Sequence, residues 1–124
     1  MRLTRLALLM GAAWLAMACG GAAIPQERLT SAEGAVRAAE AAGAPTVPQA
    51  ALHLKKAQDH IAQAKALIAD DENERADYVL QRAEADAELA LAQAREDQAK
   101  KEAQEAIDMV EELRGKTTGK GTAQ

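Results

Sequence analysis

A long stretch without helix breakers dominates this chain: from Gln49 to Arg114 it contains neither glycine nor proline. Good helix formers such as alanine, leucine, glutamate and lysine make up most of the stretch. In its first part, apolar residues alternate four and three positions apart, which predicts a helix with one apolar face. That face consists of Ala50, Leu54, Ala57, Ile61, Ala64 and Ile68.

An acidic cluster at residues 70–73 interrupts this apolar face. Asp71 with Glu74 three residues later has the form of an N-terminal capping box. The cluster therefore predicts a turn and a new helix, from about Glu72 to Arg114, that folds back on the preceding one. Two apolar groups recur at helical spacing along it. They are Ala76, Leu80, Ala83, Ala87, Ala90 and Ala94, then Ala99, Ala103, Ala106, Val110 and Leu113.

A single straight helix of about 100 Å is the competing interpretation. The register of the first apolar face, continued by sevens, reaches Tyr78, Ala85, Leu89 and Ala92. The same register also places charged residues in that face: Asp71, Arg75, Arg82 and Glu96. Because charges in an apolar face are unfavourable, we expect the hairpin, in which the face of residues 50–68 packs on residues 76–90.

Glycine and proline define the remaining segments. A helix from about Glu27 to Ala42 is expected to end at Gly43-Ala44-Pro45, and residues 45–48 separate it from the next helix. The glycine- and threonine-containing residues 115–124 are expected to form a disordered tail after the helical domain of residues 27–114. The predicted fold is all-α: an antiparallel helical hairpin with an additional N-terminal helix, three helices in all, of which the third is long and coiled-coil-like.

The composition excludes several classes of protein. Beyond residue 18, leucine, isoleucine and valine number only sixteen, and phenylalanine is absent. Such a chain cannot build the large apolar pocket that most enzymes need. The formal net charge of −4 excludes a basic nucleic-acid-binding surface, so no nucleic-acid partner is expected.

The N-terminus has the features of a bacterial lipoprotein signal. Arg2 and Arg5 precede an uncharged, mostly apolar run over residues 6–18, which is too short to span a bilayer. It ends in Leu15-Ala16-Met17-Ala18-Cys19, which resembles the lipobox of bacterial lipoproteins. We therefore expect residues 1–18 to be removed, Cys19 to carry the lipid and residues 19–26 to form a flexible linker. Gly20 after the cysteine favours the outer membrane, with the protein facing the periplasm.

Candidate chemical groups are few. His53 and His60 are seven residues apart, about 10 Å along a helix, which is too far to share one metal ion, so we expect both to be solvated. Ser31 lacks the glycine-rich turn of a hydrolase nucleophile, and the carboxylates of Glu84 and Glu88 have no pocket that would adapt them to acid–base chemistry. We expect a protein that is not an enzyme and that binds no metal or cofactor.

The second apolar group of the long helix is the candidate partner surface. Residues 50–68 are too few to cover a helix of residues 72–114, so Ala99, Ala103, Ala106, Val110 and Leu113 remain to be covered. Either the N-terminal helix folds over them, or they meet a protein partner or a second copy as a coiled coil. The sequence leaves both alternatives open.

Several segments together resemble a known family. They are the Ala-Pro break before Gln49-Ala50-Ala51-Leu52, then Lys56-Ala57, Ala62, Ala64-Lys65-Ala66-Leu67, the acidic turn, Tyr78, and Ala83-Glu84-Ala85-Asp86-Ala87-Glu88-Leu89-Ala90. This pattern, over about residues 27–105, looks like the alanine-rich bacterial envelope lipoproteins of the domain-of-unknown-function 4398 family. The resemblance implies a lipoprotein signal before an alanine-rich helical domain, and it implies no activity and no site residues.

The expected function is that of a lipid-anchored, non-enzymatic structural or adaptor protein of the cell envelope, attached to the membrane through its N-terminal lipid. An alternative is a small accessory or sensing subunit of an envelope complex, in which His53 and His60 would be the sensing groups.

Overall fold

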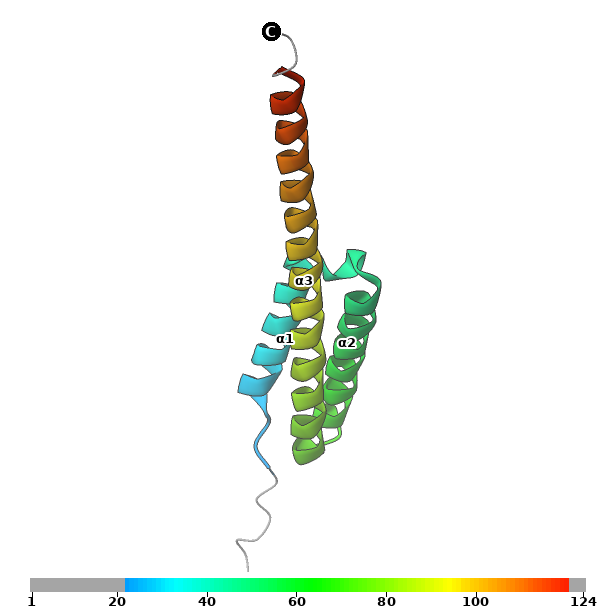
Figure 1. The fold of residues 1–124 in the computed structure, drawn as a ribbon. Helices are drawn as coiled ribbons and strands as arrows, with labels where there is room; N and C mark the ends of the chain where they lie inside the picture. Colours follow the sequence, from blue (N-terminus) through cyan, green and yellow to red (C-terminus); the bar gives the residue numbers. More distant parts are fainter. Residues whose placement is uncertain (1–21, 121–124) are drawn as a thin grey trace, which may run out of the picture.

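The computed structural model describes residues 22–120, which form three α-helices and one short 3-10 helix. They are α1 (Gln26–Ala41), η1 (Ala44–Thr46), α2 (Pro48–Ala69) and α3 (Asn73–Lys120). α1 and α2 lie beside the first half of α3, and α3 continues well past both toward the C-terminus (Figure 1). This arrangement confirms the predicted all-α hairpin with an additional N-terminal helix, and it excludes the single straight helix.

The predicted apolar faces form the core. In α2, Ala50, Leu54, Ala57, Ile61 and Ala64 are buried, and Ile68 at the end of the face is half-buried. All six residues of the first group of α3 are buried against them, and Leu80 is the largest side chain that solvent does not reach. Alanine supplies most of this core, so the helices gain little apolar burial per turn.

α1 packs on the same half of α3 as α2 does. Ala32, Val36 and Ala39 of α1 are buried in the shared core. Polar contacts with α2 show that the two helices are antiparallel: Lys65 lies 2.7 Å from Glu33, and the Gln58 amide donates a 2.9 Å hydrogen bond to Glu40. The described chain is thus a three-helix bundle whose third helix is far longer than the other two.

Two residues with left-handed backbone end the first two helices. Gly43 follows α1 with φ +87°, and its amide donates to the Glu40 carbonyl at 3.0 Å. Asp71 follows α2 with φ +59°; its amide donates to the Ile68 carbonyl, and the Glu72 amide donates to the Leu67 carbonyl. Those two bonds form a Schellman motif, which normally has glycine at this position.

The predicted role of Asp71 as the N-cap of the long helix is therefore wrong. A residue with positive φ does not have the extended backbone of an N-cap. Asp71 ends α2 instead, and α3 begins at Asn73. The acidic cluster does make the predicted turn, but it does so through the end of the preceding helix.

The predicted end of the long helix at Arg114 is also wrong, because α3 continues through Lys120. Glycine inside a helix costs only about 1 kcal/mol relative to alanine, so Gly115 alone does not end one. Contacts four residues apart continue across it: Lys116 pairs with Glu112, and the Thr117 hydroxyl donates to the Leu113 carbonyl at 2.6 Å. Of the predicted tail, residues 121–124 lie outside the described residues.

Among residues 22–120, no helix combines the length and the apolar character needed to cross a membrane.

Candidate functional site

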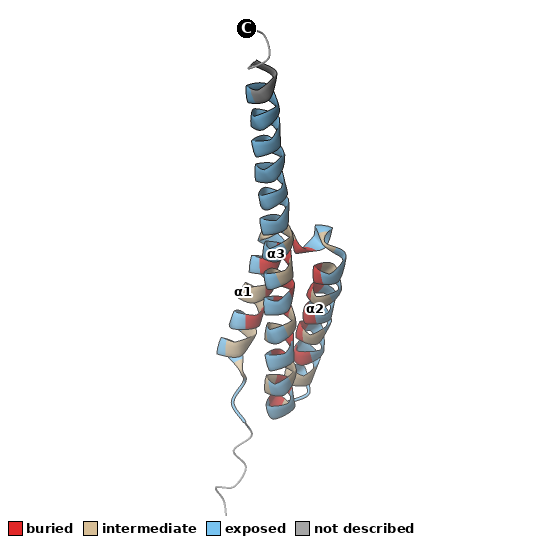
Figure 2. Cartoon of the chain, in the orientation of Figure 1, coloured by how far each residue is buried: buried red, intermediate tan, exposed pale blue. Residues whose placement is uncertain are grey.

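The second half of α3 has no cover within the described chain. Every residue from Gln98 to Thr117 is exposed, whereas buried residues line the first half (Figure 2). The predicted partner surface of Ala99, Ala103, Ala106, Val110 and Leu113 lies wholly within this part, with Val110 47% and Leu113 57% exposed. Since α1 packs on the first half of α3, the alternative in which it covers this surface is wrong.

Contacts within the helix support the uncovered half. Glu96 pairs with Lys100 at 2.6 Å, and Asp97 pairs with Lys101 at 2.7 Å, each four residues apart. The hydrogen bond with Glu96 raises the pKa of Lys100, so the Lys100 ammonium keeps its charge at neutral pH. Solvent screens such exposed pairs and their stabilisation is small, so local contacts hold this half far more weakly than packing holds the bundle.

The exposed apolar face continues along the bundle half as well. On the side of α3 opposite the core, Tyr78 is 61% and Leu89 is 43% exposed. They are in heptad register with the predicted partner surface, and together these residues form what we call the outer stripe. It consists of Tyr78, Ala85, Leu89, Ala92, Ala99, Ala103, Ala106, Val110 and Leu113, all exposed.

The first part of the outer stripe consists of Tyr78, Ala85, Leu89 and Ala92. These are the residues that the competing interpretation, a single straight helix, places on its apolar face. The sequence shows the heptad spacing of these residues, but it does not show on which side of α3 the helices α1 and α2 pack. In the structure, α3 carries two apolar faces on opposite sides, one buried by α1 and α2 and one exposed. Ile107 and Met109, 53% and 63% exposed, widen the exposed face near its C-terminal end. A shallow groove of about 370 Å³ lies there, lined by Ala106, Ile107, Val110, Glu111 and Arg114.

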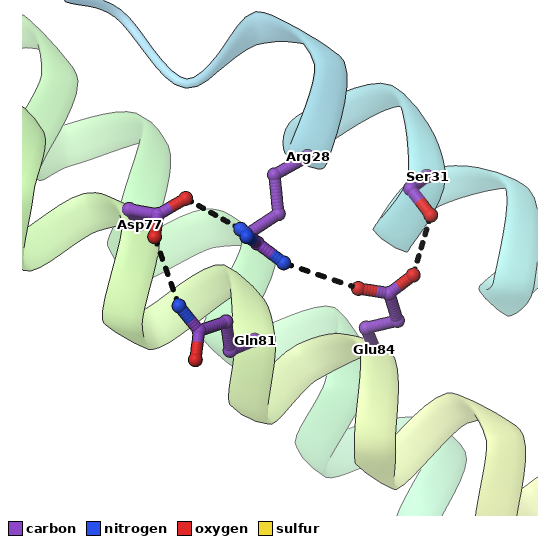
Figure 3. Close-up of polar contacts among 5 residues, drawn as sticks. All are labelled: Arg28, Ser31, Asp77, Gln81 and Glu84. Carbon is purple, nitrogen blue, oxygen red and sulfur yellow. Dashed lines mark hydrogen bonds and ion pairs between the residues drawn. The ribbon is translucent and has the colours of Figure 1, made fainter.

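A polar cluster fastens α1 to α3 near the start of both helices (Figure 3). The Arg28 guanidinium donates to Asp77 at 2.5 Å and lies 3.7 Å from Glu84, which also accepts a 2.5 Å hydrogen bond from the Ser31 hydroxyl. Gln81 donates to the other oxygen of Asp77 at 2.9 Å. The Arg28 hydrogen bond lowers the pKa of Asp77, so the carboxylate stays ionised. Because Ser31 donates to a carboxylate that is already paired with arginine, the cluster acts as a clamp between helices and not as a nucleophile with its base.

An open cavity of about 780 Å³ lies beside this clamp. Residues 22–28 and the first turns of α3 line it. Asn73 is 9% exposed there; its amide nitrogen donates to the Ala22 carbonyl at 2.8 Å, and its amide oxygen has no partner within the described residues. The cavity is wide and open to solvent, and the polar groups that line it serve the clamp and the start of α3.

The two histidines contact the same carboxylate. His53 Nδ1 lies 2.9 Å from one oxygen of Asp86, and His60 Nε2 lies 3.6 Å from the other. All three side chains are only 21–25% exposed, at the contact between α2 and α3, so the expectation of solvated histidines is wrong. Asp86 belongs to another helix and left no local signal in the sequence. Within residues 22–120, no three histidine, cysteine or carboxylate side chains form a group that could hold a metal ion.

The predicted lipidation site, Cys19, lies outside the described residues.

Comparison with protein-family models identifies the family of the chain. Residues 27–106 match the model of the domain of unknown function DUF4398. The chain belongs to this family. The match confirms the resemblance seen in the sequence, and it covers nearly all of α1, all of α2, the bundle half of α3 and the start of its uncovered half.

The boundary of the DUF4398 match divides the outer stripe. Its residues from Tyr78 to Ala106 fall inside the matched region, while Val110 and Leu113 lie beyond it. Neither the comparison with curated proteins nor that with solved structures finds a match. Membership of the DUF4398 family thus leaves the activity of the chain open.

Proposed function

We propose that this protein is a lipid-anchored lipoprotein of the bacterial cell envelope that acts through protein partners, as a non-enzymatic structural or adaptor protein. The leader supports the anchor, because a cationic start, a short apolar run and Leu15-Ala16-Met17-Ala18-Cys19 are what lipoprotein processing requires. Gly20 favours the outer membrane, with the helices in the periplasm. Two or three acyl chains on Cys19 would hold the chain firmly at the membrane.

The uncovered half of α3 carries the adaptor part of this proposal. A helix that extends far past its bundle, with an exposed apolar face including Val110 and Leu113, is suited to binding another helix in coiled-coil fashion. Solvent-exposed large apolar side chains gathered on one face commonly mark an interaction site. The bundle half of the chain then serves to hold this helix straight and near the membrane.

The anchor is tested by intact-mass analysis of protein extracted from the envelope. The proposal predicts the loss of residues 1–18 and a mass increment for lipid on Cys19. A Cys19→Ser variant should leave the membrane fraction. If the native chain keeps its leader, or if the variant still fractionates with membranes, the anchor part of the proposal fails.

Introducing negative charges at the centre of the uncovered apolar face of α3 tests whether this face binds the partner. Replacing Ala106 and Val110 together with glutamate should abolish complexes captured by in vivo cross-linking, because the two positions would lose apolar contact and carry charge into the interface. Glutamate is a good helix former, so the helical circular-dichroism signal should persist. A matched control, which adds the same two negative charges, places glutamate at Gln98 and Gln104, away from this face of the helix. If complexes survive the first change, partners bind elsewhere.

The cluster of His53, His60 and Asp86 favours a second candidate, a sensing subunit. Protonation of either imidazole would strengthen its contact with Asp86 across the α2–α3 interface. NMR titration of the histidines with candidate envelope ligands tests it, and histidine signals that do not shift would eliminate this candidate.

A further inference from the structure

We infer that the outer stripe binds the outer stripe of a second copy of this chain, with the two α3 helices antiparallel. This inference rests on the proposed function only in taking the uncovered face of α3 as the partner surface; it does not depend on the lipid anchor. The charged residues within and beside the stripe indicate that its partner is a second copy of the chain in antiparallel orientation.

Two charges inside the stripe exclude a parallel pair along its length. Arg82 and Glu96 occupy positions of the heptad that face the partner helix. In a parallel pair, each would lie against its own equivalent, so arginine would meet arginine and glutamate would meet glutamate. At the edge of the stripe, Arg95 would also lie beside Lys100 of the second copy. Like charges held together in an interface are strongly unfavourable.

An antiparallel pair removes these conflicts, because no residue of the stripe then faces its own equivalent. The best register places Leu89 opposite Ala106 and Val110 opposite Ala85, so that these two large side chains meet small ones. In the same register Leu113 lies opposite Arg82, and Glu96 lies opposite Ala99. The same register brings Arg95 beside Glu102 of the second copy, and by symmetry this ion pair forms twice. Within residues 22–120, the side chain of Arg95 makes no ion pair and no hydrogen bond, so its charge is available.

Neighbouring registers are less favourable for electrostatic reasons. A shift of one heptad in one direction puts Arg95 against Arg95, and a shift in the other direction puts Glu102 against Glu102. A shift of two heptads restores a favourable pair, Glu88 with Arg95. In that register, however, Val110 and Leu113 lie opposite positions that precede the start of α3. Among the registers that bring opposite charges together, only the one with Arg95 beside Glu102 covers the whole stripe.

The bundle leaves room for such a partner. Its buried residues on α3, including Leu80 and Ala87, face away from the stripe, and α1 and α2 occupy that side (Figure 2). A second α3 at the usual interaxial distance of about 8–10 Å would be the third neighbour of the helix. The overlap from Tyr78 to Thr117 is about 60 Å long, which offsets the small area that each alanine buries.

This geometry has a consequence for the anchored protein. The starts of the two α3 helices would lie about 75 Å apart, at opposite ends of the pair. Both N-terminal lipids would reach the same membrane when the pair lies along its surface.

Charge-reversal variants test the inference. Sedimentation equilibrium of the purified full-length protein in density-matched detergent measures dimerisation, at protein concentrations from micromolar to hundreds of micromolar. Arg95→Glu and Glu102→Arg should each weaken dimerisation at least about tenfold, because each places like charges side by side twice. The double variant, which exchanges the two charges, should recover the affinity of the wild type. Lys56→Glu and Glu105→Arg, the same charge changes on exposed residues away from the stripe, should have no effect.

Three outcomes would overturn the inference: a wild-type chain that stays monomeric throughout, a double variant that does not recover, or an Arg95→Glu variant that dimerises more tightly. The last would indicate a parallel pair, since the introduced carboxylate would then lie beside Lys100 of the second copy. A chain extracted from the native envelope that carries no lipid but still dimerises would instead refute the anchor in the proposed function and leave this inference standing.

Discussion

The two halves of α3 have similar sequences and different surroundings. Residues 76–94 and residues 99–113 each repeat alanine and an occasional leucine or valine at helical spacing, yet the core face of the first set is buried and the second set is exposed. The difference has two causes: the second set lies on the side of α3 opposite the core, and α1 with 16 residues and α2 with 22 are much shorter than α3 with 48. An apolar repeat therefore determines which faces of a helix can pack, while the positions and lengths of the other helices determine which of those faces the chain covers itself.

Truncating one leucine in each half should show the largest difference. Leu80→Ala removes the largest fully buried side chain and should lower the free energy of unfolding by about 3 kcal/mol. Leu113→Ala removes an exposed side chain and should change it by less than about 0.5 kcal/mol. Urea denaturation followed by circular dichroism, at protein concentrations low enough to keep the chain monomeric, measures both. Equal losses in the two variants would show that the halves do not differ as described.

A substitution in the turn between α2 and α3 should stabilise the bundle. Asp71 holds a left-handed conformation that costs a non-glycine residue about 1 kcal/mol or more, so Asp71→Gly should raise the stability of the bundle by about 0.5–1 kcal/mol. The adjacent Asp70 has φ −92°, and Asp70→Gly is the matched control that should lower stability. Thermal melts compare the two. A destabilised Asp71→Gly variant would contradict the Schellman assignment.

The clamp between α1 and α3 should give the smallest effect. The pKa of Asp77 is lowered by its hydrogen bond with Arg28, so the stabilisation is fully present above the unfolded value of about 3.9 and is lost as the pH falls through the lower folded value. Because the pair is partly exposed, we expect a loss of only a few tenths of a kcal/mol. Stability measured from pH 5 down to pH 2 should fall less steeply in Asp77→Asn than in the wild type. Identical slopes would show that the clamp does not contribute.

The core faces could be predicted because they depend on spacing alone. Ala57, Ile61 and Leu80 lie at helical intervals in a stretch without breakers, and the structure buries all three. Asp71 and Gly115 show the limit of local rules. An aspartate in an acidic cluster fits both a helix start and a helix end, and a glycine stops a helix only where the following residues favour another conformation.

Polar contacts between helices could not be predicted from the sequence. Nothing near His53 or His60 in the chain points to Asp86, and nothing near Arg28 points to Asp77. The outer stripe was visible as a register, but only the positions of α1 and α2 show that it faces outward. The sequence of α3 contains two heptad registers of apolar residues, which lie on different sides of the helix. Because one bundle cannot cover both sides, this pattern would have indicated that one apolar face points outward.

Hydrogen exchange of the α3 amides tests the central claim, that residues 76–94 are covered by the chain itself and residues 99–113 by a second copy. The amides of the first set should exchange slowly at every protein concentration. Those of the second should exchange quickly in dilute protein and slowly in concentrated wild-type protein, but remain fast in concentrated Arg95→Glu protein. Uniformly slow exchange along α3 in dilute protein, or fast exchange of residues 99–113 at every concentration, would contradict the account.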